Sequence, residues 1–284
     1  MLRTWVVRAV KPVLSEAAWD WLRHLDPGAR RRDAERAVRE ARRLERRAND
    51  LSTRRLSEPS LTELAKHFKT DKWGRHRYTP HYQRHLRHLK KQTFTLFEIG
   101  IGGYSRAGEG GASLRMWKAY FPKAQLLGLD IEDKSFVDEE RIRSFQGSQV
   151  DATLLAEIVA GAENLQVIID DGSHVSAHIV ETFAILFPLL PEGGIYVIED
   201  TQTSYWERYG GSTDLNDPRT SMNMVKAMLD GLNYEEWTAP GYEPTYAQLH
   251  VVAVHAYHNL IFIEKGRNDE EAVRRARPGA LPPG

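Results

Sequence analysis

Two short apolar runs, each followed at once by acidic residues, dominate the hydrophobic pattern of the chain. The runs are Val167–Ile169 and Ile195–Ile198, and the acids that follow them are Asp170, Asp171, Glu199 and Asp200. Short runs rich in β-branched residues are typical of strands that are buried on both faces of a parallel sheet. The pattern therefore predicts two buried strands whose carboxyl ends carry four carboxylates.

The segment between these strands has the length and composition of one helix. It runs from about Ser176 to Phe187 and is followed by Pro188, Pro191 and the pair Gly193-Gly194. A strand–helix–strand unit with a right-handed crossover sets the two strand ends side by side, and ligands of open α/β sheets bind at such ends. Because the four acids and His174 would meet there, we expect a site for a hard divalent cation with oxygen ligands.

The remaining pattern extends this unit into a larger α/β domain. Further strands are predicted at Thr93–Ile99, Gln125–Asp130, Arg143–Phe145, His250–His258 and Asn259–Glu264, and helices at Thr62–Phe68, His81–Lys90, Ser113–Tyr120 and in the segment that ends near Leu232. We expect a Rossmann-like sheet in residues 59–266, mostly parallel with an antiparallel last strand. A helical extension (1–58) would precede this domain, and a flexible tail (267–284) would follow it.

The predicted extension is amphipathic and basic. Between Ala29 and Leu56, eleven arginines stand against five acids, although the net charge of the 284-residue chain is zero. Two interpretations stay open: packing on the main domain or a second subunit, and peripheral contact of residues 1–56 with an anionic membrane. Without interleaved aromatic residues, the pattern does not indicate nucleic-acid binding.

The composition of the chain limits the cellular compartments in which we expect the protein. The chain contains no cysteine, no apolar run of membrane-spanning length and no secretory signal pattern. Disulfides, thiolate metal sites and cysteine nucleophiles are therefore excluded. We expect a cytoplasmic protein, with contact at the inner face of the membrane left open.

A glycine-rich turn follows the first predicted strand, in the sequence FEIGIGGYS. Glycines at such a turn let the backbone approach a ligand closely. The third glycine of a dinucleotide-binding motif is missing, and Glu98 suits a cofactor with a cationic amino-acid end. Asp130 ends the next strand, where a carboxylate can accept the hydroxyls of a ribose. Together they favour S-adenosylmethionine over NAD, although Glu98 as a simple ion-pair partner stays open.

Several segments, taken in order, resemble one enzyme family. They are AKHFKTDKWGRHRYTPHY, FEIGIGGYSRAGEGGASLRMWKAYFPKAQLLGLDI, VIIDDGSHVSAH, GGIYVIEDTQTSYW and HNLIFIEKG. Together they resemble the class I, metal-dependent sugar O-methyltransferases that methylate deoxysugars of macrolides. The likeness runs from about Leu61 to Gly266. It implies an S-adenosylmethionine-dependent enzyme, homo-oligomeric as the family usually is, that uses Mg²⁺, with Mn²⁺ as the other option.

Carried over to this sequence, the resemblance also implies roles for single residues. It implies Asp171, Glu199 and Asp200 as metal ligands and His174 as the general base. The implied cofactor contacts are Glu98, Gly100, Gly102, Gly103, Tyr104, Ser113, Asp130, Ser148 and Gln149. We place Asp170 with them, although its position at a strand end leaves a metal-ligand role open. A purely structural role for His174 at a helix N-terminus also stays open.

This set of residues predicts a reaction. A divalent cation that binds a sugar hydroxyl lowers its pKa, and a histidine can take the proton. The acceptor is expected to be a small molecule or glycan with a vicinal diol, in a natural product or a cell-envelope glycan or glycolipid. The alternatives are a catechol-type O-methyltransferase, an NAD-dependent oxidoreductase on a similar sheet, and a non-catalytic scaffold. Clustered, mutually repelling carboxylates argue against a scaffold.

Overall fold

The computed structural model describes residues 59–103, 109–239 and 241–273. The predicted extension at 1–58, Tyr104 and the last eleven residues of the predicted tail lie outside this part of the chain. The boundaries of the predicted domains therefore stay predictions. Among the helices that are described, none has the length and apolar character needed to cross a membrane.

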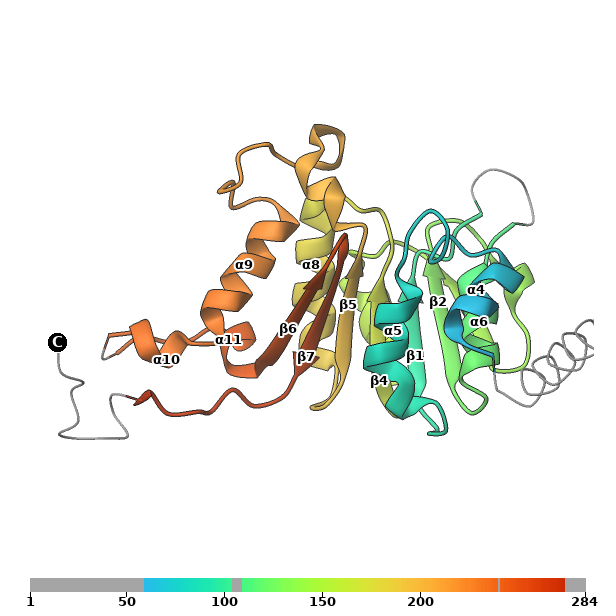
Figure 1. The fold of residues 1–284 in the computed structure, drawn as a ribbon, viewed down its shortest axis with the longest axis horizontal. Coiled ribbons are helices and arrows are strands. Elements are labelled where there is room, and N and C mark those ends of the chain that lie inside the picture. Colours follow the sequence, from blue (N-terminus) through green and yellow to red (C-terminus); the bar gives the residue numbers. More distant parts are fainter. Residues whose placement is uncertain (1–58, 104–108, 240, 274–284) are drawn as a thin grey trace, which may run out of the picture. The chain divides into compact units, whose positions relative to one another are not determined.

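A seven-stranded sheet with the order β3-β2-β1-β4-β5-β7-β6 forms the centre of the described residues (Figure 1). Its strands are β1 (Thr95–Ile99), β2 (Gln125–Asp130), β3 (Ile142–Gln146), β4 (Leu165–Asp170), β5 (Ile195–Glu199), β6 (Val251–Tyr257) and β7 (Leu260–Lys265). Strands β1 to β5 run parallel, and β7 runs antiparallel to both of its neighbours. The prediction of a mostly parallel, Rossmann-like sheet is confirmed.

Helices connect the strands. They are α4 (Leu61–Phe68), α5 (Thr79–Leu86), α6 (Ala112–Tyr120), α7 (Ala152–Ala160), α8 (Ser176–Leu189), α9 (Ser221–Gly231), α10 (Tyr234–Trp237) and α11 (Tyr246–His250), with 3₁₀ turns at Arg87–Leu89, Ser135–Val137, Thr201–Tyr205 and Glu207–Tyr209. The sequence pattern did not predict α7, α10 or α11. It also ended α8 too early, because Pro188 lies inside the last turn. The Lys265 ammonium donates to the carbonyls of Phe187 and Pro188 at that helix end.

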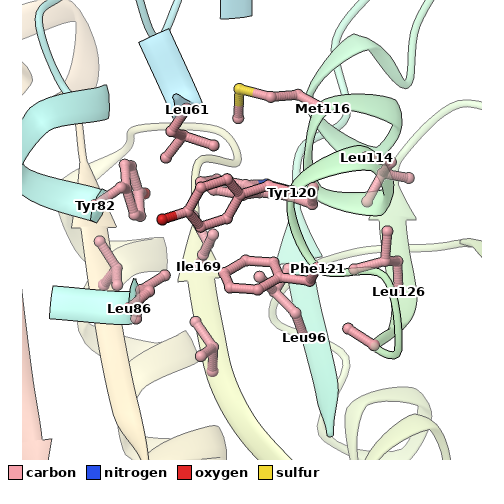
Figure 2. Close-up of a cluster of buried hydrophobic side chains, with 14 of the residues drawn as sticks. Leu61, Tyr82, Leu86, Leu96, Leu114, Met116, Tyr120, Phe121, Leu126 and Ile169 are labelled. Atoms are coloured by element: carbon pink, nitrogen blue, oxygen red, sulfur yellow. The ribbon is translucent and has the colours of Figure 1, made fainter. Parts of the chain in front are cut away.

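Alternate residues of the central strands face two separate apolar clusters. In β4, Val167 and Ile169 belong to the cluster under α4, α5 and α6, whereas Ile168 belongs to the one under α7, α8 and α9. Figure 2 shows the first cluster, where side chains such as Leu61 and Tyr82 gather over the sheet. Each fully buried aliphatic side chain contributes about 1.5–3 kcal/mol.

Burial on both faces also fixes the strand register, since a slip by one residue would exchange the two faces. In the observed register Ile99 pairs with Asp170, and Asp170 pairs with Ile198. The carboxyl ends of β1, β4 and β5 are therefore level. The acidic residues at these ends lie along one edge of the sheet, as the sequence predicts.

Candidate active site

Three carboxylates at this edge surround a single buried ammonium. The Nζ atom of Lys72 lies 2.6 Å from Glu199 Oε1, 2.9 Å from Asp171 Oδ2 and 3.1 Å from Glu98 Oε1. Lys72, Glu98 and Glu199 are each no more than 2% exposed. Tyr82, from α5, donates a second hydrogen bond to Glu199 Oε1. We call Glu98, Asp171 and Glu199 the inner acid group.

The inner acid group carries more negative charge than Lys72 neutralises. Burial lowers the pKa of Lys72, but Asp171, Glu199 and Glu98 outweigh this effect and hold it well above its ordinary value. Burial first, and then the Glu199 carboxylate, raise the pKa of Asp171. Burial also raises the pKa of Glu199 to about 7, against the opposing effects of Lys72 and Tyr82. An added cation would relieve this repulsion.

A second group of ligating side chains shares Asp171. Ligand atoms of Asp171, His174 and Asp200 lie within 4.8 Å of one another, as do those of the inner acid group. We call Asp171, His174 and Asp200 the outer group. His174 Nε2 is 3.8 Å from Asp200 Oδ2, and Asp200 Oδ1 accepts a hydrogen bond of 2.6 Å from the Tyr78 hydroxyl. Burial lowers the pKa of His174, and Asp200 opposes that shift.

Backbone conformation sets the direction of two outer residues. His174 and Asp200 both have left-handed backbone angles, with φ of 58° and 53°. A residue other than glycine pays a conformational cost there, of order 1–3 kcal/mol. Both exceptions fall at the same edge of the sheet, which turns these two side chains toward Asp171.

The residues fit a hard divalent cation. Carboxylate oxygens are the ligands that Mg²⁺ prefers, and the two groups bring them from the ends of three strands to a common point at Asp171. Of the predicted metal ligands, Asp171 belongs to both groups, Glu199 to the inner one and Asp200 to the outer one. Mn²⁺ accepts the same ligands.

The glycine turn after β1 lies directly against this edge. A Cβ atom on Gly100 would come within 2.0 Å of the Asp171 carbonyl oxygen, so only glycine fits. Gly102 and Gly103 also have positive φ, at 70° and 84°. Asp130 Oδ2 accepts a hydrogen bond of 3.1 Å from Ile101 N and thereby fastens the turn to the end of β2.

The buried carboxylate of Glu98 lies between Ser113 and Lys72. Ser113, near the start of α6, donates a hydrogen bond of 2.7 Å to Glu98 Oε2. The other oxygen, Oε1, is buried without a hydrogen bond, although it faces the Lys72 ammonium. The ion pair with Lys72 is the role that the sequence left open for Glu98.

The side chain of Gln149 links the loop after β3 to the acidic edge of the sheet by hydrogen bonds. Its side-chain amide donates to Asp170 Oδ1 at 3.2 Å and accepts from Ser173 N at 2.6 Å. Burial raises the pKa of Asp170 to about 7, and among the described residues Asp170 belongs to neither ligand group. Ser148 lies partly buried beside Gln149. Tyr104, the remaining predicted cofactor contact, lies outside the described residues.

Sequence reasoning missed Lys72 and Tyr82, two of the groups that hold the acids in place. Lys72 and Tyr78 come from the loop after α4, and Tyr82 comes from α5. His76 stacks on Tyr78 and lies 3.6 Å from Asp200 Oδ1. No periodicity marks these residues in the sequence. The likeness of their segment to the methyltransferase family was the available signal.

The chain is similar in sequence to known sugar O-methyltransferases. No protein-family model matches the chain. It is 46% identical over 218 residues to mycinamicin VI 2''-O-methyltransferase of Micromonospora griseorubida, covering 76% of this chain and 55% of that protein. It is 44% identical over 229 residues to demethylmacrocin O-methyltransferase of Streptomyces fradiae, covering 80% and 57%.

A solved structure shows the same likeness. The MycE methyltransferase of the mycinamycin biosynthetic pathway, in complex with Mg and SAH, superimposes with a TM-score of 0.75 at 44% identity, covering 79% of this chain and 59% of that one. The chain thus spans a little over half the length of these relatives. At 44–46% identity over about three quarters of its own length, the chain is related to these sugar O-methyltransferases.

Proposed function

We propose that the chain transfers the methyl group of S-adenosylmethionine to a hydroxyl of a sugar, with the help of Mg²⁺. One observation carries the proposal. The glycine turn of the cofactor site touches the backbone of Asp171, which belongs to both candidate metal-ligand groups. A methyl donor at the turn and an acceptor at the carboxylates would therefore be neighbours. Proximity of this kind supplies much of the catalysis of a transfer reaction.

The residues divide into those that bind and those that move a proton. Asp171, Glu199 and Asp200 would hold the cation, whose bound charge lowers the pKa of an acceptor hydroxyl. His174 takes the proton of that hydroxyl, because burial favours its neutral, basic form. Asp200 then stabilises the protonated ring from 3.8 Å away.

Glu98 and the glycine turn hold the donor. Glu98 faces its cationic end, Ser113 keeps the Glu98 carboxylate in place, and Asp130 lies where it can accept from the ribose. Ser148, Gln149 and Asp170 complete this side of the site. Tyr104 is proposed as a further contact on the strength of the family resemblance alone.

The acceptor we propose is a sugar with a vicinal diol. The relatives are named as O-methyltransferases of macrolide and rhamnosylated tetracenomycin compounds, which favours a glycosylated natural product over a cell-envelope glycan. Homo-oligomerisation, and peripheral membrane contact through residues 1–56, remain proposals that rest on the sequence pattern.

Turnover on matched acceptors tests the proposal. Isotope-labelled S-adenosylmethionine is incubated with the protein and a panel of rhamnosides and macrolide glycosides, each paired with an analogue that lacks one hydroxyl of the diol. Simple catechols form a separate arm. We expect label in the diol-bearing glycosides, with the deoxy analogues and the EDTA-treated samples at least 100-fold slower. Equal rates with and without EDTA, or turnover restricted to catechols, would contradict the proposal.

A further inference from the structure

We propose that Lys72 is a positioning residue of the metal site. Its ammonium fills the inner acid group and thereby confines a divalent cation to the oxygens that face His174 and Asp200. The inference rests on the proposed function, because it concerns where the metal of that reaction sits. Lys72 itself touches neither donor nor acceptor in this account.

The geometry gives the ammonium the place that a metal ion would otherwise take. Lys72 Nζ is within 3.1 Å of an oxygen of every member of the inner acid group. Its side chain is 1% exposed, so the charge is not shared with water. Two cations a few ångströms apart repel strongly in a buried site. A divalent ion would therefore avoid the centre of the inner acid group while Lys72 remains there.

Lys72 also selects which carboxylate oxygens stay available. It holds Oδ2 of Asp171 and Oε1 of Glu199, and Tyr82 donates to the same Glu199 oxygen. Asp171 and Glu199 can then each offer a metal one oxygen instead of two. Mg²⁺ keeps a small, fixed number of ligand positions. Ligands that bind through single oxygens leave more of these positions for the hydroxyls of a diol.

This role makes a prediction that a merely structural lysine would not. Loss of a buried cation destabilises the metal-free protein in either case. If Lys72 competes with the metal for the same carboxylates, however, its removal also strengthens Mg²⁺ binding, because four carboxylates then face the ion without an internal cation. A structural lysine would leave Mg²⁺ affinity unchanged or weaken it.

The test uses the full chain and the variant Lys72→Met, which removes the charge and leaves an unbranched side chain one atom shorter. Lys265→Met is the matched control. Lys265 is also buried, at 4% exposed, but it donates hydrogen bonds to the carbonyls of Phe187 and Pro188. It lies at the opposite ends of the strands from the acids, because its neighbour Glu264 pairs with Ile195 at the start of β5. Mg²⁺ affinity is measured by calorimetry at pH 8, and thermal unfolding is followed with and without Mg²⁺.

We expect Lys72→Met to bind Mg²⁺ at least tenfold more tightly than the wild type, to unfold at a lower temperature without metal, and to recover stability when Mg²⁺ is added. Lys265→Met should lose stability with Mg²⁺ affinity unchanged. Equal or weaker Mg²⁺ binding by Lys72→Met would overturn the inference. If the wild type bound neither Mg²⁺ nor S-adenosylhomocysteine, that result would instead contradict the proposed function.

A second variant covers the case in which Lys72→Met does not fold. Lys72→Arg keeps the charge, so we expect it to fold without metal. Its forked guanidinium would take carboxylate oxygens that Lys72 leaves available, and Mg²⁺ affinity should fall by about tenfold. Mg²⁺ affinity equal to that of the wild type would contradict the inference.

Discussion

Two clusters of ligand-type side chains differ in how their charges are compensated. The inner acid group at the carboxyl ends of β1, β4 and β5 has three carboxylates around one ammonium, and Glu98, Glu199 and Lys72 in it are buried. The second cluster joins His85 of α5, His255 of β6 and Glu264 of β7, whose ligand atoms also lie within 4.8 Å of one another. Only in the first cluster do the carboxylates outnumber the cationic groups that face them.

In the histidine cluster the partners satisfy one another. His255 Nε2 lies 2.8 Å from Glu264 Oε1, and His85 Nε2 lies 2.9 Å from the Tyr257 hydroxyl. The side chains of His255 and Glu264 are 37% and 40% exposed, so water completes their solvation. Spacing that suits a metal is therefore weak evidence by itself. Buried charge that the protein leaves uncompensated is the stronger indication of a ligand.

Replacement of Asp171 should give the largest difference in effect between the two clusters. Asp171→Ala removes the residue that both ligand groups share, so we expect no measurable Mg²⁺ binding and a loss of methyl transfer of roughly 10³-fold or more. S-adenosylhomocysteine should still bind. The matched change His255→Ala should alter neither binding nor turnover. Normal Mg²⁺ binding in Asp171→Ala would remove the carboxylates from the metal site.

Loss of the base should have the next largest effect. His174→Ala is expected to slow methyl transfer by about 10²- to 10⁴-fold, the range of a lost general base, while Mg²⁺ and S-adenosylhomocysteine affinities stay within a few-fold of the wild type. Single-turnover rates with a diol-bearing glycoside would check this. Wild-type turnover in the variant would leave His174 with a structural role.

Two tyrosine-to-phenylalanine variants compare how much a hydrogen bond in each cluster stabilises the protein. Tyr82→Phe leaves the buried Glu199 carboxylate with one donor fewer, and we expect the free energy of unfolding of the metal-free protein to fall by about 1–3 kcal/mol. Tyr257→Phe removes a partner of the half-buried His85, so its effect should stay below about 1 kcal/mol. Urea unfolding measures both. A larger loss for Tyr257→Phe would reverse the comparison.

The smallest expected effect is a pH dependence in the histidine cluster. Burial, then His255, lowers the pKa of His85 to about 4, with Arg84 and His81 acting in the same direction and Glu264 opposing. Since the unfolded chain binds this proton near pH 6.5, the stabilising contribution of neutral His85 is complete above that pH and is lost as the pH falls toward 4.

His85→Gln should therefore reduce the decline in stability between pH 6.5 and pH 4.5. Solvent screening of a partly exposed group limits the difference to about 1 kcal/mol. Urea unfolding of wild type and variant at the two pH values measures it. An identical decline in both proteins would show that folding does not lower the pKa of His85.

Local sequence pattern predicted the sheet and the acidic edge, and the register explains why. Short apolar runs fix which residues are buried, and acids that directly follow them must lie at the strand ends. Lys72 could not be found in this way, because its hydrogen-bonded partners Asp171 and Glu199 are 99 and 127 residues away in the chain. The left-handed backbone of His174 was equally hidden, since tertiary surroundings impose it.

The shorter elements show the same limit. Helix α7 was not predicted, although Asp151 caps it by accepting hydrogen bonds from two backbone N–H groups. A nine-residue helix has little periodicity of its own and depends on packing, here through Leu155 and Ile158. Pro188 suggested a helix end, but α8 continues to Leu189. The Lys265 ammonium there donates hydrogen bonds to the carbonyls of Phe187 and Pro188.

Calorimetric titration of the full chain with S-adenosylhomocysteine and, separately, with Mg²⁺ tests the central claim most directly, with NADH and an EDTA-treated sample as controls. We predict one site for S-adenosylhomocysteine, one EDTA-sensitive site for Mg²⁺, and no binding of NADH. Binding of NADH without S-adenosylhomocysteine, or a protein that binds S-adenosylhomocysteine but no divalent cation, would contradict the account.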